Sequence, residues 1–302
     1  MKKLLLITPL LVPAAALADD ANVQEESIQV SQYYSDSFSS EPFYGNDTID
    51  ADSFSAPRTQ KSGAGSFLGQ NWDVTLGATV LNSPEYVGAG KNETRIFPMI
   101  SAKYHLSNKN HAYVSPYGSI GYEHAYSDKL QTGIATGWRQ DRDNDDAAIL
   151  AGTSNIGTAI EVGPYVVYKP AETLSLRGDL MVDVSNQHNG IAAKLSANYA
   201  IPVSHERVRA NLMLSTLYGD KDFMETYFGV SQAEAAPGRP AYNPDSGFRD
   251  VTYGGNISYN FTRNAFVRLD ARVRELVGDA KDSPIMDEST NFISALSVGY
   301  NF

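Results

Sequence analysis

Ser185, Asn186 and His188 lie close together in the segment SNQHNG, residues 185–190. A serine, an imidazole and an amide that orients the imidazole are the parts of a nucleophilic hydrolase, because the imidazole can remove the proton from the hydroxyl. The order differs from the His-x-Ser-Asn run in which some outer-membrane lipid hydrolases carry these groups. Polar residues followed by Gly are also typical of β-turns. We therefore interpret the segment as a turn and keep lipid hydrolysis as a remote alternative.

Carboxylates gather in the segment DRDNDD, residues 141–146. Their oxygens could hold Ca²⁺, but the segment lacks the Gly at the sixth position and the final Glu of an EF-hand loop. We interpret it as a solvated acidic loop. The chain contains no Cys, which excludes disulfides, thiolate metal sites and a Cys nucleophile. We predict a non-enzymatic protein with no cofactor, no metal site and no catalytic residues.

Segments of about ten residues carry most of the remaining pattern, from Trp72 onward. Each alternates apolar with polar or small side chains, and turn residues separate one segment from the next. Such period-2 alternation predicts β-strands with one apolar face. Alternation alone does not distinguish a soluble sandwich from a membrane barrel.

Three features favour the membrane barrel. The segments approach the 9–11 residues, roughly, that cross a bilayer at a tilt. Aromatic side chains fall near strand ends, where interfacial girdles lie in such barrels: Tyr199, Tyr218, Tyr259, Phe261, Tyr300 and Phe302. Residues 1–18, MKKLLLITPLLVPAAALA, have the basic start, short apolar run and A-x-A end of a secretory signal peptide. Because unpaired backbone groups are costly in lipid, we predict a closed, all-β, transmembrane antiparallel β-barrel.

The predicted organisation has three parts: a signal peptide (1–18), a disordered periplasmic extension (19–70) and an outer-membrane β-barrel (71–302). Residues 19–66 are rich in Ser, Asp and Gly and show no sustained period. We interpret them as a plain linker, with a partner-binding tail as the alternative.

Twelve strands are predicted, although ten remain an alternative because 221–229 is the weakest of them. The predicted strands are 72–81, 95–105, 111–124, 130–139, 157–168, 173–184, 190–200, 207–218, 221–229, 249–261, 264–275 and 290–302. The tight turns at 107–110, 219–220 and 262–264 would face the periplasm, and the longer loops 82–94, 230–248 and 277–289 the exterior. By this count SNQHNG is periplasmic, away from the outer leaflet, and so is the long loop 140–156. Either this long periplasmic loop has a special role, or the predicted number of strands before it is wrong.

Charged residues in mid-strand share the parity that would face the barrel lumen. Their mixed signs favour a salt-bridged, filled interior, with a narrow polar channel as the alternative. The predicted lumen-facing charges are Arg177, Asp179, Asp183, Lys194, Arg207, Arg209, Arg268, Asp270, Arg272 and Arg274.

The chain ends in ISALSVGYNF, residues 293–302, which alternates up to the terminal carboxylate. Chain ends usually fray, but the last strand of a barrel must close against the first. We predict that Leu296, Val298 and Tyr300 face lipid and that Phe302 lies at the periplasmic interface. A strand with this ending also resembles the signal that the outer-membrane assembly machinery reads.

Several stretches resemble one known family. They are SPEYVGAGKNETRIFPMISAKY (83–104), YFGVSQAEAA (227–236), YNPDSGFRDV (242–251) and LVGDAKDSPIMDESTNFISALSVGYNF (276–302). Together, in this order, they are similar to the MipA/OmpV family of Gram-negative outer-membrane proteins over roughly residues 70–302.

The resemblance implies a small barrel in the cell outer membrane that acts as a scaffold for murein-remodelling enzymes. The implied partners are a lytic transglycosylase, a penicillin-binding protein, outer-membrane lipid or lipopolysaccharide and the assembly machinery. A porin-like diffusion channel or a surface receptor or adhesin is the alternative function. Nucleic acid is not expected as a partner, because 35 Asp plus Glu outnumber 24 Lys plus Arg.

Overall fold

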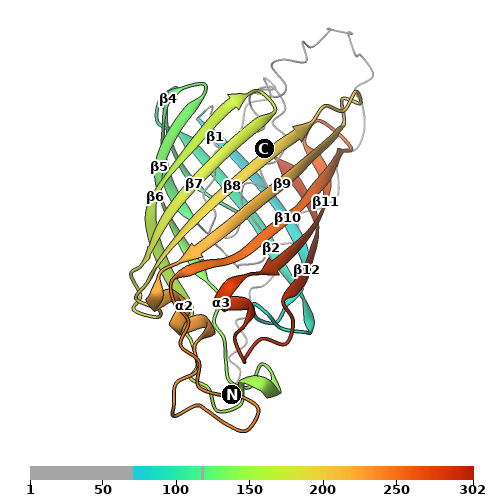
Figure 1. Cartoon of the computed structure of the whole chain (residues 1–302). Coiled ribbons are helices and arrows are strands. Elements are labelled where there is room, and N and C mark those ends of the chain that lie inside the picture. Colours follow the sequence, from blue (N-terminus) through green and yellow to red (C-terminus); the bar gives the residue numbers. More distant parts are fainter. Residues whose placement is uncertain (1–70, 117–118) are drawn as a thin grey trace, which may run out of the picture.

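The computed structural model describes residues 71–116 and 119–302, so the predicted signal peptide and extension lie outside the described residues. Within them the chain forms a closed antiparallel barrel in the strand order β1-β12-β11-β10-β9-β8-β7-β6-β5-β4-β3-β2 (Figure 1). The strands are β1 (Trp72–Pro84), β2 (Asn92–His105), β3 (Asn110–Val114), β4 (Ile120–Ser127), β5 (Leu130–Arg139), β6 (Ala159–Ala171), β7 (Leu174–Asp183), β8 (Ile191–Ile201), β9 (Val208–Gly219), β10 (Gly247–Asn260), β11 (Ala265–Leu276) and β12 (Thr290–Asn301). The predicted fold class is confirmed.

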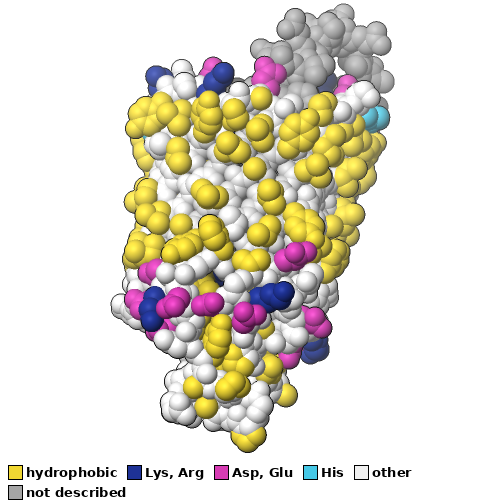
Figure 2. All heavy atoms as spheres, viewed as in Figure 1, with side chains coloured by type: hydrophobic (Ala, Val, Ile, Leu, Met, Phe, Trp, Pro, Cys, Tyr) yellow, Lys and Arg dark blue, Asp and Glu magenta, His cyan; other side chains and the backbone are white. Residues whose placement is uncertain are grey.

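The outer wall of the barrel carries the apolar parity of each strand. Hydrophobic side chains are spread over it, as Figure 2 shows in yellow, and charged side chains gather at the two rims. The aromatic residues named above are all at least 37% exposed on this wall. An exposed apolar band between polar rims is the surface that a bilayer covers. No helix in the described part of the chain is long and apolar enough to span a membrane.

The last strand closes the barrel. β12 pairs with β11 on one side and with β1 on the other, from Thr75 opposite Asn301 to Asn82 opposite Ser294. The pairing extends to the final residue, since the Phe302 N–H donates to the Val74 carbonyl at 2.9 Å. β12 is therefore hydrogen-bonded along both of its edges up to the last residues, as the lipid environment demands.

The two ends of the barrel differ. The short-turn end carries the turns 106–109, 128–129, 172–173, 202–207 and 261–264 together with the chain terminus. The opposite end carries the longer connections 85–91, 140–158, 184–190, 220–246 and 277–289, which we call the cap. The cap contains α2 (Lys221–Phe228), the short 3₁₀ turn η2 (Ala148–Leu150) and α3 (Gly278–Lys281).

The predicted count of twelve is right, but two of the predicted strands are wrong. Residues 111–124 form two strands, because the segment at Ser115 and Pro116 turns the chain: the Ser115 N–H donates to the Ser119 carbonyl at 2.8 Å. The predicted strand 221–229 is replaced by α2, which covers Lys221–Phe228. Its N-terminus is capped by Asp220, whose carboxylate accepts the Phe223 N–H at 3.0 Å.

The two errors leave the total number of strands unchanged. The prediction nevertheless gave the wrong direction to every strand from β5 to β9. The loop 140–156 and the turns 185–190 and 219–220 consequently lie at the cap, on the same side as the other long loops (Figure 1). The long loop that did not fit the predicted topology is thus explained by the hidden turn after β3.

Candidate functional site

Charged side chains line the inside of the barrel, where nearly all of them are buried. Those below 9% exposure in the described strands are Lys103, Glu123, Arg139, Glu161, Arg177, Asp179, Asp183, Lys194, Arg249, Asp250, Arg268, Asp270, Arg272 and Arg274. Buried charges require partners, because desolvation costs several kcal/mol per ion, roughly. Two groups of interactions supply them, one on each side of the interior.

The first group joins β5 and β6 to the cap. Arg139 donates to both carboxylate oxygens of Glu161, at 2.9 Å each, and its guanidinium lies 4.8 Å from the ring centre of Phe223 in α2. His188 accepts the Gly190 N–H on Nδ1, so its proton is on Nε2, which donates to Glu161 at 3.0 Å. One carboxylate thus ties the barrel wall to the 184–190 loop.

A neighbouring part of the same wall is organised by tyrosines. Arg177 pairs with Asp179 at 2.6 Å and lies 4.0 Å from the ring centre of Tyr165. The Tyr165 hydroxyl donates to Glu123 at 3.2 Å and accepts from Tyr113 at 3.3 Å. These contacts run across β3, β4, β6 and β7. They fill this side of the lumen with interlocked side chains.

The second group lies on β8 to β11 and is more basic. Arg249 pairs with Asp250 at 2.5 Å, and Asp270 accepts from Arg268 at 2.9 Å and from Arg272 at 3.4 Å. This basic wall also holds Lys194 and Arg274. Its buried cations are Lys194, Arg249, Arg268, Arg272 and Arg274, against the carboxylates of Asp250 and Asp270.

On β4 to β7 carboxylates outnumber cations, with Glu123, Glu161, Asp179 and Asp183 against Arg139 and Arg177. The interior therefore has two walls of opposite net charge.

Most of the predicted lumen-facing charges lie inside the barrel. Arg177, Asp179, Asp183, Lys194, Arg268, Asp270, Arg272 and Arg274 are buried there. Arg209 is partly buried at the start of β9. Arg207 is different: it is exposed in the 202–207 turn, because β9 begins one residue later than predicted. Sequence reasoning missed Arg139, Glu161, Arg249 and Asp250, although their strand parity could have identified the first two.

The cap is a packed structure in its own right. One cluster joins Phe223, Met224 and Phe228 of α2 to Leu217 and Ala280. A second joins Tyr86, Ala89, Leu150, Val230 and Ile285, which come from four different loops. Burial of such side chains stabilises each by about 1.5–3 kcal/mol. The loops are therefore held together by apolar contacts between them, which no single loop could form alone.

Hydrogen bonds connect the same loops. Arg239 donates to the carbonyls of Ile149 at 2.7 Å and Ala151 at 3.0 Å, and thereby fixes η2 against the 230–246 segment. Glu234 accepts from both the N–H and the hydroxyl of Ser154 at 2.7 Å. Burial alone would raise the pKa of Glu234, but these bonds and those from Ser231 outweigh it and lower the pKa to about 2. The ionised carboxylate is thus part of the folded cap.

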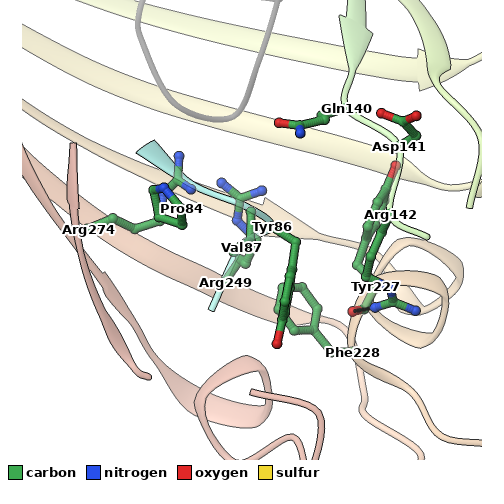
Figure 3. Close-up of a pocket in the computed structure, with 10 residues that line it drawn as sticks. All are labelled: Pro84, Tyr86, Val87, Gln140, Asp141, Arg142, Tyr227, Phe228, Arg249 and Arg274. Carbon is green, nitrogen blue, oxygen red and sulfur yellow. Dashed lines mark hydrogen bonds between the residues drawn. The ribbon is translucent and has the colours of Figure 1, made fainter. Parts of the chain in front are cut away.

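A small cavity of about 30 Å³ lies where the cap meets the lumen (Figure 3). Its lining comes from β1, the 85–91 connection, the 140–158 loop, α2, β10 and β11. Three arginines, Arg142, Arg249 and Arg274, and two tyrosines, Tyr86 and Tyr227, are among the lining residues. Of these five residues, Arg274 is among the predicted lumen-facing charges, and the other four were not predicted as site residues.

The SNQHNG segment is a turn at the cap end, which corrects its predicted periplasmic position. Asp183 organises it: its carboxylate accepts the Ser185 hydroxyl at 2.6 Å and the N–H groups of Ser185, His188 and Asn189. Both nitrogens of His188 are engaged by Glu161 and Gly190 instead of Ser185. Neither the hydroxyl nor the imidazole is arranged as a nucleophile and its base.

The DRDNDD segment is also closed by its own groups. The Asp146 carboxylate accepts the Asp143 N–H at 2.8 Å, and Arg142 turns inward to donate to the Tyr227 carbonyl at 2.6 Å. Among residues 71–116 and 119–302, no group of His, Asp and Glu side chains is placed to hold a metal ion.

The residues of the predicted assembly signal lie on the outer face of β12. Leu296, Val298, Tyr300 and Phe302 are 46–56% exposed. The rings of Tyr300 and Phe302 are in contact at 4.9 Å between centres, at the short-turn end.

Comparisons with known proteins agree with the motif resemblance. The family model described as "MltA-interacting protein MipA" matches residues 76–302. The curated "Putative outer membrane protein YiaT" of Escherichia coli strain K12 is 22% identical over 237 residues, covering 76% of this chain and 91% of the relative.

Among solved structures, a bacterial polysaccharide outer membrane secretin matches with a TM-score of 0.45 at 9% identity, covering 77% of this chain and 98% of its own. The COG4313 outer membrane channel of Pseudomonas putida F1 matches with a TM-score of 0.43 at 11% identity, covering 81% and 100%.

Proposed function

The chain belongs to the MipA family and is an outer-membrane β-barrel, and on this premise we propose that it is a non-enzymatic interaction protein for enzymes that remodel peptidoglycan. The family description names MltA as the interacting protein, and the lytic transglycosylase implied by the family resemblance is the first partner that we propose. A penicillin-binding murein synthase is the second partner that we propose. Such a scaffold would bring cleavage and synthesis of peptidoglycan together at the membrane.

One observation carries the proposal: the interior of the barrel is filled. Buried charges line both walls of the lumen, for example Arg268 on β11 and Glu161 on β6. The packed cap lies over one end of the lumen. To open a path for solutes, buried ion pairs would have to separate, and breaking such a pair costs about 3–5 kcal/mol. A barrel without an open lumen acts through its surfaces.

The short-turn end is the surface that we assign to the partners. Barrels of this class have short turns on the periplasmic side and longer loops outside, and peptidoglycan lies in the periplasm. Exposed charges of both signs occupy these turns, among them Lys109, Asp128, Lys129, Glu172, Glu206, Arg207 and Arg263. Mixed charge favours specific association with a complementary surface.

The test is affinity purification of the tagged, mature full chain from outer membranes that contain both enzymes. We expect the lytic transglycosylase to be retained, and a triple change of His205, Glu206 and Arg207 to Ser to weaken its retention. A matched control at the cap, Asp145→Ser with Glu288→Ser, should leave retention unchanged. Clean preparations without either enzyme would count against the scaffold.

A diffusion channel selective for anions is the second candidate, and the basic wall on β8 to β11 favours it. Its five buried cations would attract anionic solutes into any path that opens. Single-channel recording in planar bilayers separates the two functions. Reproducible open-channel steps with anion selectivity support the channel, and a silent bilayer that contains folded protein supports the filled barrel.

A further inference from the structure

The lining of the cavity at the junction of cap and lumen includes arginines from a cap loop and from two paired strands. Arg142 comes from the 140–158 loop, Arg249 from β10 and Arg274 from β11, and Asp141 is the one carboxylate among the lining residues. We propose that this cavity binds a small oxyanion: the carboxylate or phosphate group of a solute that arrives from the cell exterior. The site is at the opposite end from the proposed enzyme contacts and does not depend on them.

The electrostatics of the surroundings favour an anion. Asp250 pairs with Arg249 at 2.5 Å, and Lys194 interacts electrostatically with Arg249, Arg272 and Arg274 in addition to Asp250. Asp141 is exposed at the outer side, whereas Arg249 and Arg274 are 4% and 3% exposed. The buried part of the site is therefore cationic, and its low dielectric strengthens the attraction for a negative group.

Arg142 gives a second, independent indication. Its side chain is 7% exposed, and its hydrogen bond to the Tyr227 carbonyl holds it against α2. Its Nε–H is buried without a hydrogen-bond partner among the described residues. Buried donors are normally satisfied by protein, water or a ligand. An oxyanion in the cavity would supply the missing acceptor.

The size and lining of the cavity indicate which part of a ligand it takes. A volume of 30 Å³ is room for about two water positions, the space of a carboxylate or a phosphate group. Guanidinium groups match both, because their planar forks donate two parallel hydrogen bonds to two oxygens. Gln140 adds a side-chain amide to the lining, as Figure 3 shows. The rest of a larger solute would lie outside, towards the exterior.

The test is isothermal titration calorimetry, which measures the heat of anion binding to the purified full chain in detergent micelles at constant ionic strength. Inorganic phosphate and glucuronate are the anionic probes, and glucose is the neutral one. We expect saturable one-to-one binding of at least one anion and none of glucose. Binding of phosphate alone points to phosphorylated solutes, and binding of glucuronate alone points to sugar acids. Competition between the two shows one shared oxyanion site.

Variants locate the binding site. Arg274→Gln and Arg142→Gln should each raise the Kd about tenfold, the loss of one charge-assisted hydrogen bond. Arg274→Lys should raise the Kd by less than Arg274→Gln does, because it keeps the positive charge. Arg207→Gln at the short-turn end should leave the Kd unchanged. Heat-modifiable migration on gels verifies that each variant is folded. Absence of binding to the unaltered protein overturns the proposal, and so does an equal loss in Arg207→Gln and Arg274→Gln.

Discussion

The cap and the short-turn end are built by different means from the same strands. In the cap, loops far apart in sequence pack fully buried side chains such as Phe223 and Leu150 and share buried polar groups such as Glu161. At the short-turn end each turn is closed locally, as where the Thr262 hydroxyl accepts the Ala265 N–H at 2.9 Å. Its charges remain in water. The cap is thus part of the folded core, whereas the other end is free to contact partners.

Glu161 and Asp73 provide the strongest contrast between the two ends. Glu161 is fully buried with Arg139 and His188, whereas Asp73 pairs with His105 at 2.6 Å while 46% of its side chain is exposed. We expect Glu161→Gln to lower the free energy of unfolding by about 3–5 kcal/mol, because it leaves the Arg139 charge buried and unbalanced. Asp73→Asn should cost at most about 1 kcal/mol.

Urea unfolding in detergent measures both changes, and an Arg139→Gln, Glu161→Gln double variant should recover part of the loss. If Glu161→Gln and Asp73→Asn lower the free energy of unfolding equally, the buried ion pairs beneath the cap stabilise the protein no more than an exposed pair does.

Two leucines extend the contrast to apolar packing. Leu150 is 0% exposed within the cap, and Leu106 is 55% exposed in the first short turn. Leu150→Ala should destabilise the cap by about 2–5 kcal/mol, since it removes buried methyl groups and leaves a cavity. Leu106→Ala should change stability by less than about 0.5 kcal/mol. Limited proteolysis within 230–246 and thermal unfolding distinguish the two variants, and a protease-resistant Leu150→Ala cap would contradict the packing.

Acid should loosen the cap before the barrel. The folded pKa of Glu234, about 2, is below its unfolded value of about 4.3. Its contribution to stability is therefore full above about pH 4.3 and is lost as the pH falls through the folded value. We expect the rate of pepsin cleavage in the 230–246 loop to rise over this interval, and the rise to be smaller in Glu234→Gln. Glu206→Gln, at the other end, is the control. An unchanged pH profile in Glu234→Gln would contradict the expectation.

The sequence predicts the short-turn end and the wall better than it predicts the cap. Alternation from Leu174 to Asp183 or from Leu296 to Phe302 is local, because strand geometry sends successive side chains to opposite faces. The cap depends on contacts such as Arg239 with Ile149, 90 residues apart, for which no local pattern exists. The error at α2 has the same origin. Phe223 and Tyr227 are spaced for a helix, yet eight residues are too few to outweigh an alternating interpretation.

The end of β12 is expected to contribute little to stability, and it separates folding from assembly. Phe302 contributes one backbone hydrogen bond, to Val74, and a ring that is 56% exposed. Its deletion should lower the free energy of unfolding of the refolded barrel by only about 1 kcal/mol. If the terminal aromatic residue is the signal that we propose for the assembly machinery, the same deletion should sharply reduce the heat-modifiable form in outer-membrane fractions. Phe261→Ala is the matched control, because Phe261 is 54% exposed at the same end but is not terminal. Normal insertion of the Phe302 deletion would show that this residue only packs against Tyr300.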